Sequence, residues 1–275
     1  MERILRLFKT HTDFSDDKQS TIVEYEHTDL YFYRFIGGNP SETEDLRNKL
    51  LSFREKMPLL IGVFRFPFRF EGKRRQMTAR EQYFLMKDIC DAVIFFDSDG
   101  LMETIDPTTP IHQAQAAFER IENQTIHGLL EMIDETGKIN IDYQDIKTFI
   151  NRNKGPLFLH TFEGSDFDEP LKYLIATPYL PKDFTEAEQL IINIGYTREV
   201  DMEAFKQINL RLNDLFDKAD LFKIGTYLMD EPGRLFKISL LVNGIEDPVE
   251  APLPPNKKPY TKYKNFIKKW MSQTR

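Results

Sequence analysis

Three polar side chains that could take part in chemistry crowd together near the middle of the chain. Asn140, Asp142 and Asp145 fall in the run INIDYQD, just before the helical pattern DIKTFI. A carboxylate in a loop can orient and polarise a water molecule for attack on a bound group. A carboxylate at the start of a helix can equally cap its free amides. Taken alone, the spacing fits Asp142 or Asp145 as a helix cap, so both interpretations stay open.

A long amphipathic helix is predicted to lead into these residues. Apolar side chains recur at helical spacing from Ile111 to Ile133, which indicates a helix with one buried face. Gly137 ends the pattern. The helix should therefore hold the polar loop at one end of a packed core.

Strands and helices alternate before this long helix. The expected strands are 4–8, 21–26, 29–36, 59–64 and 92–96, and the expected helices are 41–56 and 78–90. Ser41 followed by Glu44 is typical of a capping box at the start of a helix. Because the stronger strands are apolar nearly throughout and are separated by helices, they predict a parallel α/β sheet.

A second α/β unit is predicted after the polar loop. Its expected helices are 146–151, 168–176 and 202–216, and its expected strands are 157–162, 187–194, 221–227 and 235–242. We therefore expect an α/β protein with these parts: a parallel-sheet domain at 1–109, a central helix at 110–136, a second α/β domain of the α+β sandwich type at 137–247, and a Pro-rich linker with a basic tail at 248–275.

Composition excludes several classes of protein. The chain of 275 residues is 41% apolar and has a net charge of −7, which argues for a packed core and against nucleic-acid binding. No apolar run is long enough to span a membrane, and the N-terminus is too charged for a secretory signal. The single cysteine, Cys90, fits a reducing cytoplasm and excludes a zinc site, and the five histidines show no metal-binding spacing. We expect a cytoplasmic protein with no bound metal.

The C-terminal tail differs in charge from the rest of the chain. Residues 251–275 hold seven Lys or Arg and no acid, so the residues before them carry a net charge of −14. The tail predicts an amphipathic helix with an apolar stripe and a basic remainder: Tyr263, Phe266, Ile267 and Trp270 against Lys262, Lys264, Lys268 and Lys269. Docking on its own body, on a protein partner or on an anionic membrane surface are the alternatives.

Several motifs in order resemble the bacterial tubulin homologue FtsZ. PFRFEGKRRQ at 67–76 resembles that family's PF-x-FEG-x-(K/R)-R motif. MKDICDAVIFFDSDG, at 86–100, and GKINIDYQDIKTFI, at 137–150, resemble the segments on either side of the family's central helix. The resemblance covers roughly residues 28–245.

This resemblance implies a Rossmann-like GTP-binding domain, a central helix and a C-terminal activation domain. Subunits of the family stack head to tail, and the loop after the central helix inserts acidic side chains into the nucleotide site of the neighbour. Asn140, Asp142 and Asp145 match that activating loop at its polar positions. The resemblance thus implies that these residues position a water molecule for attack on GTP held by another subunit.

The nucleotide side departs from the family pattern. A glycine-rich phosphate loop is replaced by a segment that starts at Gly37 and Gly38 and continues NPSETE. Pro40 has no amide to donate, and each glutamate near a phosphate would cost on the order of 3 kcal/mol. The first phosphate loop of the family has no counterpart in residues 1–27, which leads us to expect a truncated nucleotide-binding part.

Only parts of a nucleotide site match. Glu71 aligns with a ribose contact and Arg75 with a γ-phosphate contact, whereas Glu119 stands in place of an aspartate that binds guanine. We therefore expect a pseudo-GTPase, meaning a member of the family without nucleotide turnover of its own. Such a chain would act as a filament partner, cap or scaffold. The alternatives are a divergent GTPase that binds GTP or GDP and self-assembles, and an adaptor that works through its tail.

Overall fold

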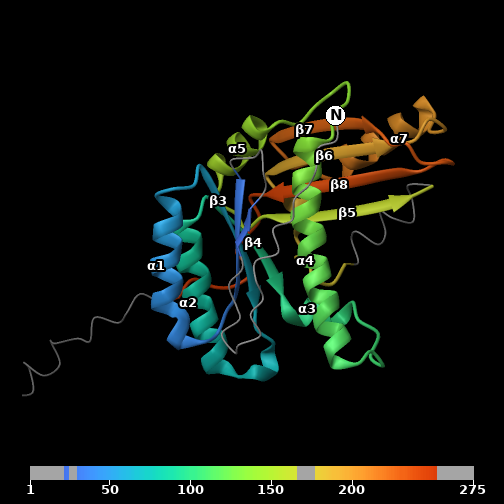
Figure 1. Ribbon diagram of the computed structural model, residues 1–275. Coiled ribbons are helices and arrows are strands. Elements are labelled where there is room, and N and C mark those ends of the chain that lie inside the picture. Colours follow the sequence, from blue (N-terminus) through green and yellow to red (C-terminus); the bar gives the residue numbers. More distant parts are fainter. Residues whose placement is uncertain (1–21, 25–29, 166–176, 253–275) are drawn as a thin grey trace, which may run out of the picture.

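A computed structural model describes residues 22–24, 30–165 and 177–252 of the chain (Figure 1). The expected strand at 4–8, the expected helix at 168–176 and the basic tail lie outside the described residues. Within them, two four-stranded sheets flank one long helix.

The first sheet has the strand order β1-β2-β3-β4, with β1 (Ile22–Glu24) antiparallel to β2 and the other strands parallel. The parallel strands are β2 (Leu30–Ile36), β3 (Leu59–Phe66) and β4 (Ala92–Asp97). Their side chains are buried on both faces, which explains why they are apolar nearly throughout. The expected parallel α/β sheet is confirmed.

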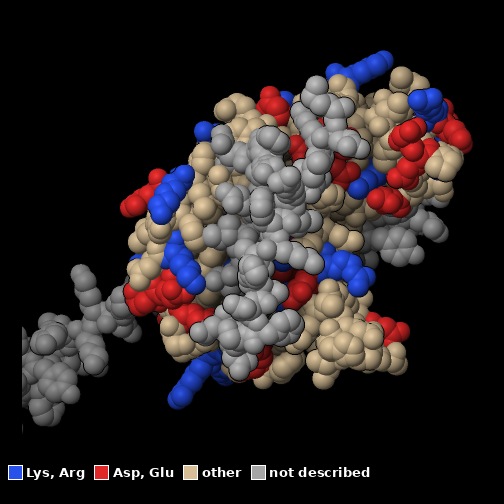
Figure 2. Space-filling view, viewed as in Figure 1, with Lys and Arg blue, Asp and Glu red and all other residues tan. Residues whose placement is uncertain are grey.

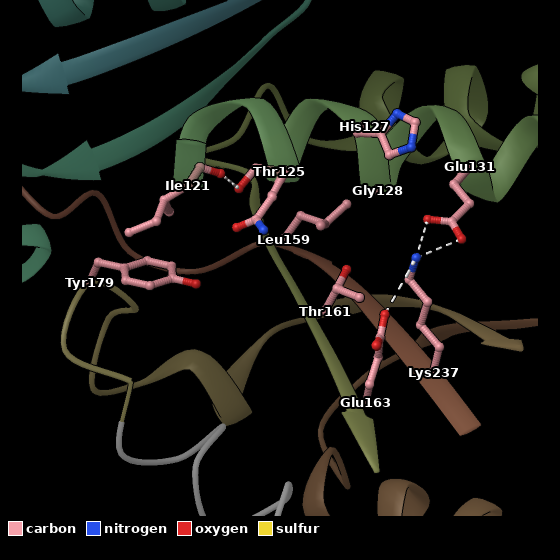
Figure 3. A pocket seen from close by; sticks show the side chains of 11 residues that line it. Ile121, Thr125, His127, Gly128, Glu131, Leu159, Thr161, Glu163, Tyr179 and Lys237 are labelled. Atoms are coloured by element: carbon pink, nitrogen blue, oxygen red, sulfur yellow. Dashed lines mark hydrogen bonds and ion pairs between the residues drawn. The ribbon is translucent and has the colours of Figure 1, made fainter. Parts of the chain in front are cut away.

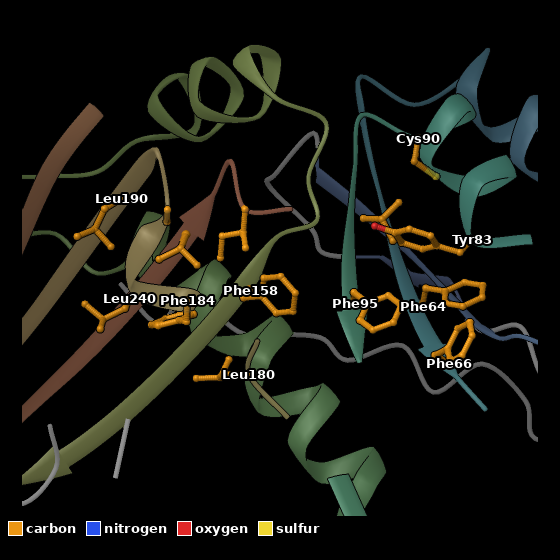
Figure 4. Packing of buried hydrophobic residues seen from close by; sticks show 14 of the residues in the cluster. Phe64, Phe66, Tyr83, Cys90, Phe95, Phe158, Leu180, Phe184, Leu190 and Leu240 are labelled. Carbon is orange, nitrogen blue, oxygen red and sulfur yellow. The ribbon is translucent and has the colours of Figure 1, made fainter. Parts of the chain in front are cut away.

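Helices cover both faces of this sheet. On one face lie α1 (Thr43–Arg54) and α2 (Lys73–Ile89), preceded by the short helices η1 (Pro40–Glu42) and η2 (Arg69–Glu71). Tyr83 of α2 packs with Phe64 and Phe95 of the sheet (Figure 4), and Met86 of the same helix belongs to this buried cluster. On the other face lie α3 (Ser98–Glu103) and α4 (Ile111–Asp134).

The second sheet has the order β5-β8-β6-β7 and is mixed. Its strands are β5 (Phe158–Gly164), β6 (Gln189–Tyr196), β7 (Leu221–Leu228) and β8 (Phe236–Asn243). β8 is antiparallel to β5 and β6, whereas β6 and β7 are parallel. Among the residues that the structure describes, three helices accompany this sheet: α5 (Tyr143–Arg152), η3 (Phe184–Glu186) and α7 (Met202–Leu215).

The long helix α4 joins the two sheets through one apolar core. Phe118, Ile126, Leu129 and Met132 are buried in a cluster that includes side chains of β3, β4, β5 and β8. A backbone hydrogen bond of 2.8 Å from Leu157 N–H to Val93 O also links the chain before β5 to β4. The orientation of the loop after α4 is therefore fixed by both sheets.

Some expected helix boundaries are wrong. Ser41 does not cap α1; instead Asn39 Oδ1 accepts hydrogen bonds from Ser41 N–H (3.2 Å) and Ser41 Oγ–H (2.8 Å), and Pro40 starts a short 3₁₀ turn. The helix α2 begins at Lys73, five residues before the expected start, because its first turn is polar and lacks the apolar pattern. The short helix α3 was missed for the same reason.

Candidate functional site

The loop between α4 and α5 holds the predicted activating residues against β7. Ile139 pairs with Thr226, whose amide donates to Ile139 O at 2.8 Å. A Cβ on Gly137 would lie 1.5 Å from Thr226 O, so only glycine permits this close approach. Asn140 Oδ1 accepts a hydrogen bond from Gly137 N–H at 2.6 Å. Asn140 therefore closes the loop rather than pointing freely outward.

Asp142 and Asp145 form a capping box at the start of α5. Asp142 Oδ1 accepts from Asp145 N–H at 2.8 Å, and Asp145 Oδ2 accepts from Asp142 N–H at 2.9 Å. The capping interpretation is thus confirmed for both carboxylates. Asp142 remains exposed, whereas the side chain of Asp145 is only 24% exposed and is ion-paired with Lys223 of β7.

The environment of Asp145 favours its charged form. Its partial burial would by itself raise the pKa, but the hydrogen bond and charge of Lys223, with the bond from Asp142 N–H, outweigh burial and hold the pKa of Asp145 below its usual range. Lys223 lies far along the chain with no motif around it, so the sequence does not predict its pairing with Asp145. Of the two acids, Asp142 is the one with a side chain open to solvent.

The segment aligned with the phosphate loop is closed by a buried glutamine of α2. Gln82 Oε1 accepts from Gly38 N–H at 2.7 Å, and Gln82 Nε2 donates to Asn39 O at 2.7 Å and to Thr43 Oγ1 at 2.9 Å. Gln82 is fully buried. The only sequence signal for this role is a polar residue among the apolar positions Ala79, Tyr83 and Met86 of α2.

Other amides of the segment are also satisfied within the protein. Gly37 N–H donates to Arg65 O at 3.0 Å, and Glu42 N–H donates to Asn39 O at 3.2 Å. Ser41 N–H reaches Asn39 Oδ1, and the amide of Thr43 reaches Pro40 O. A phosphate cradle requires free amides that converge on one point, and these amides are directed to other partners.

The two glycines of this segment make room for protein side chains. A Cβ on Gly37 would lie 2.4 Å from the ring of Phe64 and 2.9 Å from Ala79 Cβ. A Cβ on Gly38, where φ is +115°, would lie 2.3 Å from Arg75 Cγ. The structure thus brings Gly37, Gly38 and Arg75 together as a packed contact between the strand end and α2.

Glu71 and Arg75 are paired with each other. Arg75 Nε lies 2.7 Å from Glu71 Oε2, one helical turn away. Glu119 is exposed on α4, and its neighbour Glu122 is buried in an ion pair of 2.5 Å with Arg65 Nε. The Arg65 guanidinium also lies 5.9 Å from the centre of the Phe118 ring. The polar groups around the ends of β2 and β3 are therefore largely committed to one another.

A separate cleft of about 480 Å³ lies between α4 and the second sheet (Figure 3). In it Glu131 of α4 accepts hydrogen bonds at 2.8 Å from Lys237 Nζ and from Tyr227 Oη–H. Figure 3 shows Glu131 and Lys237 pointing toward each other across the cleft. This contact ties the central helix to β7 and β8, and no motif in the sequence predicts it.

Other classes of site are absent from the part of the chain that the structure describes. None of its His, Cys, Asp and Glu side chains form a cluster of three that could hold a metal ion. No helix among those residues is long and apolar enough to cross a bilayer. Among the described residues that are visible in Figure 2, Lys and Arg side chains are scattered among Asp and Glu and do not gather in the kind of basic stripe that nucleic-acid binding favours.

Comparisons with known proteins agree with the resemblance seen in the sequence. No family model matches the chain. The cell division protein FtsZ of Haloferax mediterranei is 25% identical over 198 residues, which are 71% of this chain and 52% of that protein. The chain thus spans about half the length of this relative.

Solved structures show the same fold. An empty FtsZ dimer of M. jannaschii matches with a TM-score of 0.61 and 17% identity, over 81% of this chain and 77% of that one. A GTPγS-bound protofilament of CetZ2 from Haloferax volcanii matches with a TM-score of 0.60 and 13% identity, over 86% and 69% of the two chains. Each of these matches covers most of the chain.

Proposed function

Because the chain belongs to the FtsZ/tubulin superfamily, we propose that it is a pseudo-GTPase that joins a filament as a partner. It offers the face with the loop at 137–145 to the GTP-bearing face of an FtsZ-like subunit. Its own segment at 37–44 takes no nucleotide. The chain would then cap or modulate a filament rather than extend it through a second GTP-filled junction.

The hydrogen bonds of Gln82 carry this proposal. They direct the Gly38 amide into the protein and tie the segment to α2. The space above Gly38 is filled by Arg75, whose charge is already balanced by Glu71. A phosphate would have to break these contacts and would meet the carboxylates of Glu42 and Glu44.

The opposite face supports the partner role. Asp142 is exposed, and the bond from Asp145 N–H occupies only one of its carboxylate oxygens. The second oxygen can therefore accept a proton from water or orient it. The rigid attachment of the loop to β7 through Ile139 and Gly137 keeps this carboxylate in place. Two of the similar proteins were solved as assemblies, namely the FtsZ dimer and the CetZ2 protofilament.

The test is co-sedimentation and GTP turnover with a GTP-hydrolysing FtsZ from the organism that encodes the chain. We expect the chain to join the polymer and change its mass or its GTP turnover. Asp142→Ala should remove the effect on turnover. Asp142→Asn is the matched control for folding, because asparagine keeps an oxygen that can cap α5 but lacks the negative charge. It should fold like the natural chain and lose the effect on turnover as Asp142→Ala does. Unchanged polymer mass and turnover with the natural chain would refute the proposal.

A divergent GTPase is the second candidate, and the position of Arg75 favours it. The Arg75 guanidinium lies beside Gly38, so a rotation away from Glu71 would bring a positive charge to a phosphate at this segment. Titration with labelled GTP and Mg²⁺ separates the two candidates. Saturable binding with a Kd tighter than about 10 μM would favour the GTPase. No saturation in that range would favour the pseudo-GTPase.

A further inference from the structure

We propose that the basic tail at 260–271 docks on its own body, in a groove between α2 and the segment at 245–251. We call that segment the strap. It follows β8 and runs back from the second sheet to α2. The proposal concerns a surface other than the loop at 137–145 and does not depend on the proposed function.

The strap is firmly held where it crosses α2. Asp247 Oδ1 accepts a hydrogen bond from Tyr83 Oη–H at 2.6 Å, and Lys87 Nζ lies 2.8 Å and 2.7 Å from the two carboxylate oxygens. Ile245 is buried, and Val249 packs against the main core. These contacts fix the position of the strap, so it can form one side of a binding groove.

An open groove of about 590 Å³ lies along this wall. Apolar side chains of Phe84, Ile245 and Val249 line it, together with the carboxylates of Glu246 and Glu250. The Glu250 side chain is 92% exposed, and its contact with Arg80 is long, at 4.0 Å. Asp247 is already neutralised by Lys87, so Glu246 and Glu250 are the charges that the groove offers to a ligand.

The tail has the complementary chemistry. Residues 253–275 carry seven Lys or Arg and no acid, against a net charge of −14 for residues 1–250. Their apolar stripe, with Phe266, Ile267 and Trp270, suits the Phe84 and Val249 side of the groove. The lysines on either side of that stripe suit Glu246 and Glu250. An amphipathic helix in a groove buries such a stripe and leaves its charges at the rim.

The path of the chain favours the tail at 260–271 as the segment that fills the groove, over a separate partner molecule. Ala251 lines the groove itself, so the tail starts at the groove. The residues from 252 to 259 span at most about 28 Å when extended, which keeps 260–271 close to their starting point. A short linker gives the tethered segment an effective concentration in the millimolar range, so weak contacts are enough for docking.

The test uses Trp270, the only tryptophan of the chain. In the full chain at low salt we expect a blue-shifted Trp270 emission and weak quenching by acrylamide. Raising the ionic strength from about 0.1 M to 1 M shortens the Debye length from ~10 Å to ~3 Å, so the emission should shift to the red. Glu246→Gln with Glu250→Gln should cause the same shift at low salt.

A matched pair of substitutions controls for net charge. Glu199→Gln with Glu203→Gln removes the same charge from exposed positions before and within α7, at the opposite end of β6 from the strap, and should leave the emission unchanged. Phe84→Ser should shift the emission to the red without a change in charge. A solvent-exposed Trp270 in the unaltered chain would overturn the proposal. So would equal effects of the two glutamate pairs, or a blue shift that appears only as protein concentration rises, which would indicate docking between copies.

Discussion

Replacing Gln82 by leucine is expected to loosen the segment at 37–44 and to destabilise the whole domain. Gln82 is fully buried, and its amide group makes the hydrogen bonds to Gly38, Asn39 and Thr43 described above. Leucine fills a similar volume but has no polar atoms. The buried amide of Gly38 would then lose its partner, whereas the carbonyl of Asn39 keeps the hydrogen bond from Glu42 N–H.

The expected loss follows from the Gly38 amide. A buried donor left without a partner costs about 1–3 kcal/mol, so the free energy of unfolding should fall by about 1–3 kcal/mol. Thr43 is partly exposed, and water can replace Gln82 at its hydroxyl. For a protein of this size, each kcal/mol corresponds to roughly 2–4 °C in Tm.

Urea denaturation and amide hydrogen exchange measure this effect, and Gln76→Leu provides the control. Gln76 lies on the same helix, and its Nε2 has no hydrogen-bond partner among the described residues. The same substitution there should change the free energy of unfolding by less than about 1 kcal/mol. Exchange at Gly38 should accelerate only in Gln82→Leu. If the two variants unfold alike, or if Gly38 exchanges no faster, Gln82 does not hold the segment.

Three further predictions concern other buried groups. Burial lowers the pKa of His160 from 6.5 to about 4, so between those pH values the unfolded chain binds a proton that the folded chain does not. The free energy of unfolding should therefore fall as the pH decreases from 6.5 to 4. In urea titrations across this range, His160→Gln should flatten the slope. Burial raises the pKa of Cys90 to about 12, so a thiol reagent should modify Cys90 only after unfolding; rapid labelling of the native protein would contradict this. Lys237→Met should lower the free energy of unfolding by about 2 kcal/mol, which is less than the loss of a fully buried pair, because 21% of the Lys237 side chain is exposed. A double-mutant cycle with Glu131→Gln should show coupling between the two residues, and additive effects would mean that the contact is weak.

The sequence was most informative where one physical pattern dominates. The strands at 30–36, 59–66 and 92–97 are buried on both faces, and their apolar runs are visible without any partner strand. The long helix was placed to within a residue at its start, because its apolar stripe faces a core along its length. Boundaries failed at α2 and α3, where polar first turns are stabilised by local and long-range contacts that the sequence does not display.

The sequence predicts only the part of the candidate site that depends on local spacing. Asp142 and Asp145 are neighbours in sequence, and both their chemistry and their capping role follow from local spacing. The ion pair of Asp145 with Lys223 joins residues on α5 and β7, and nothing in either segment predicts it. The family pattern predicts separate nucleotide contacts for Glu71 and Arg75, whereas in the structure the turn from η2 into α2 brings them together as an ion pair.

Periodicity and local propensity are enough to predict the α/β class, the order of elements and the position of the acidic loop. The conformation of the segment at 37–44 depends instead on contacts between distant parts of the chain. Glycines at positions 37 and 38 are compatible with a bound phosphate and also with close packing of protein side chains. Which of the two occurs depends on the α2 side chains that lie next to these glycines. Here Gln82 Oε1 accepts the hydrogen bond from the Gly38 amide, and the Arg75 side chain fills the space beside Gly38. Both contacts join residues about forty positions apart in the sequence.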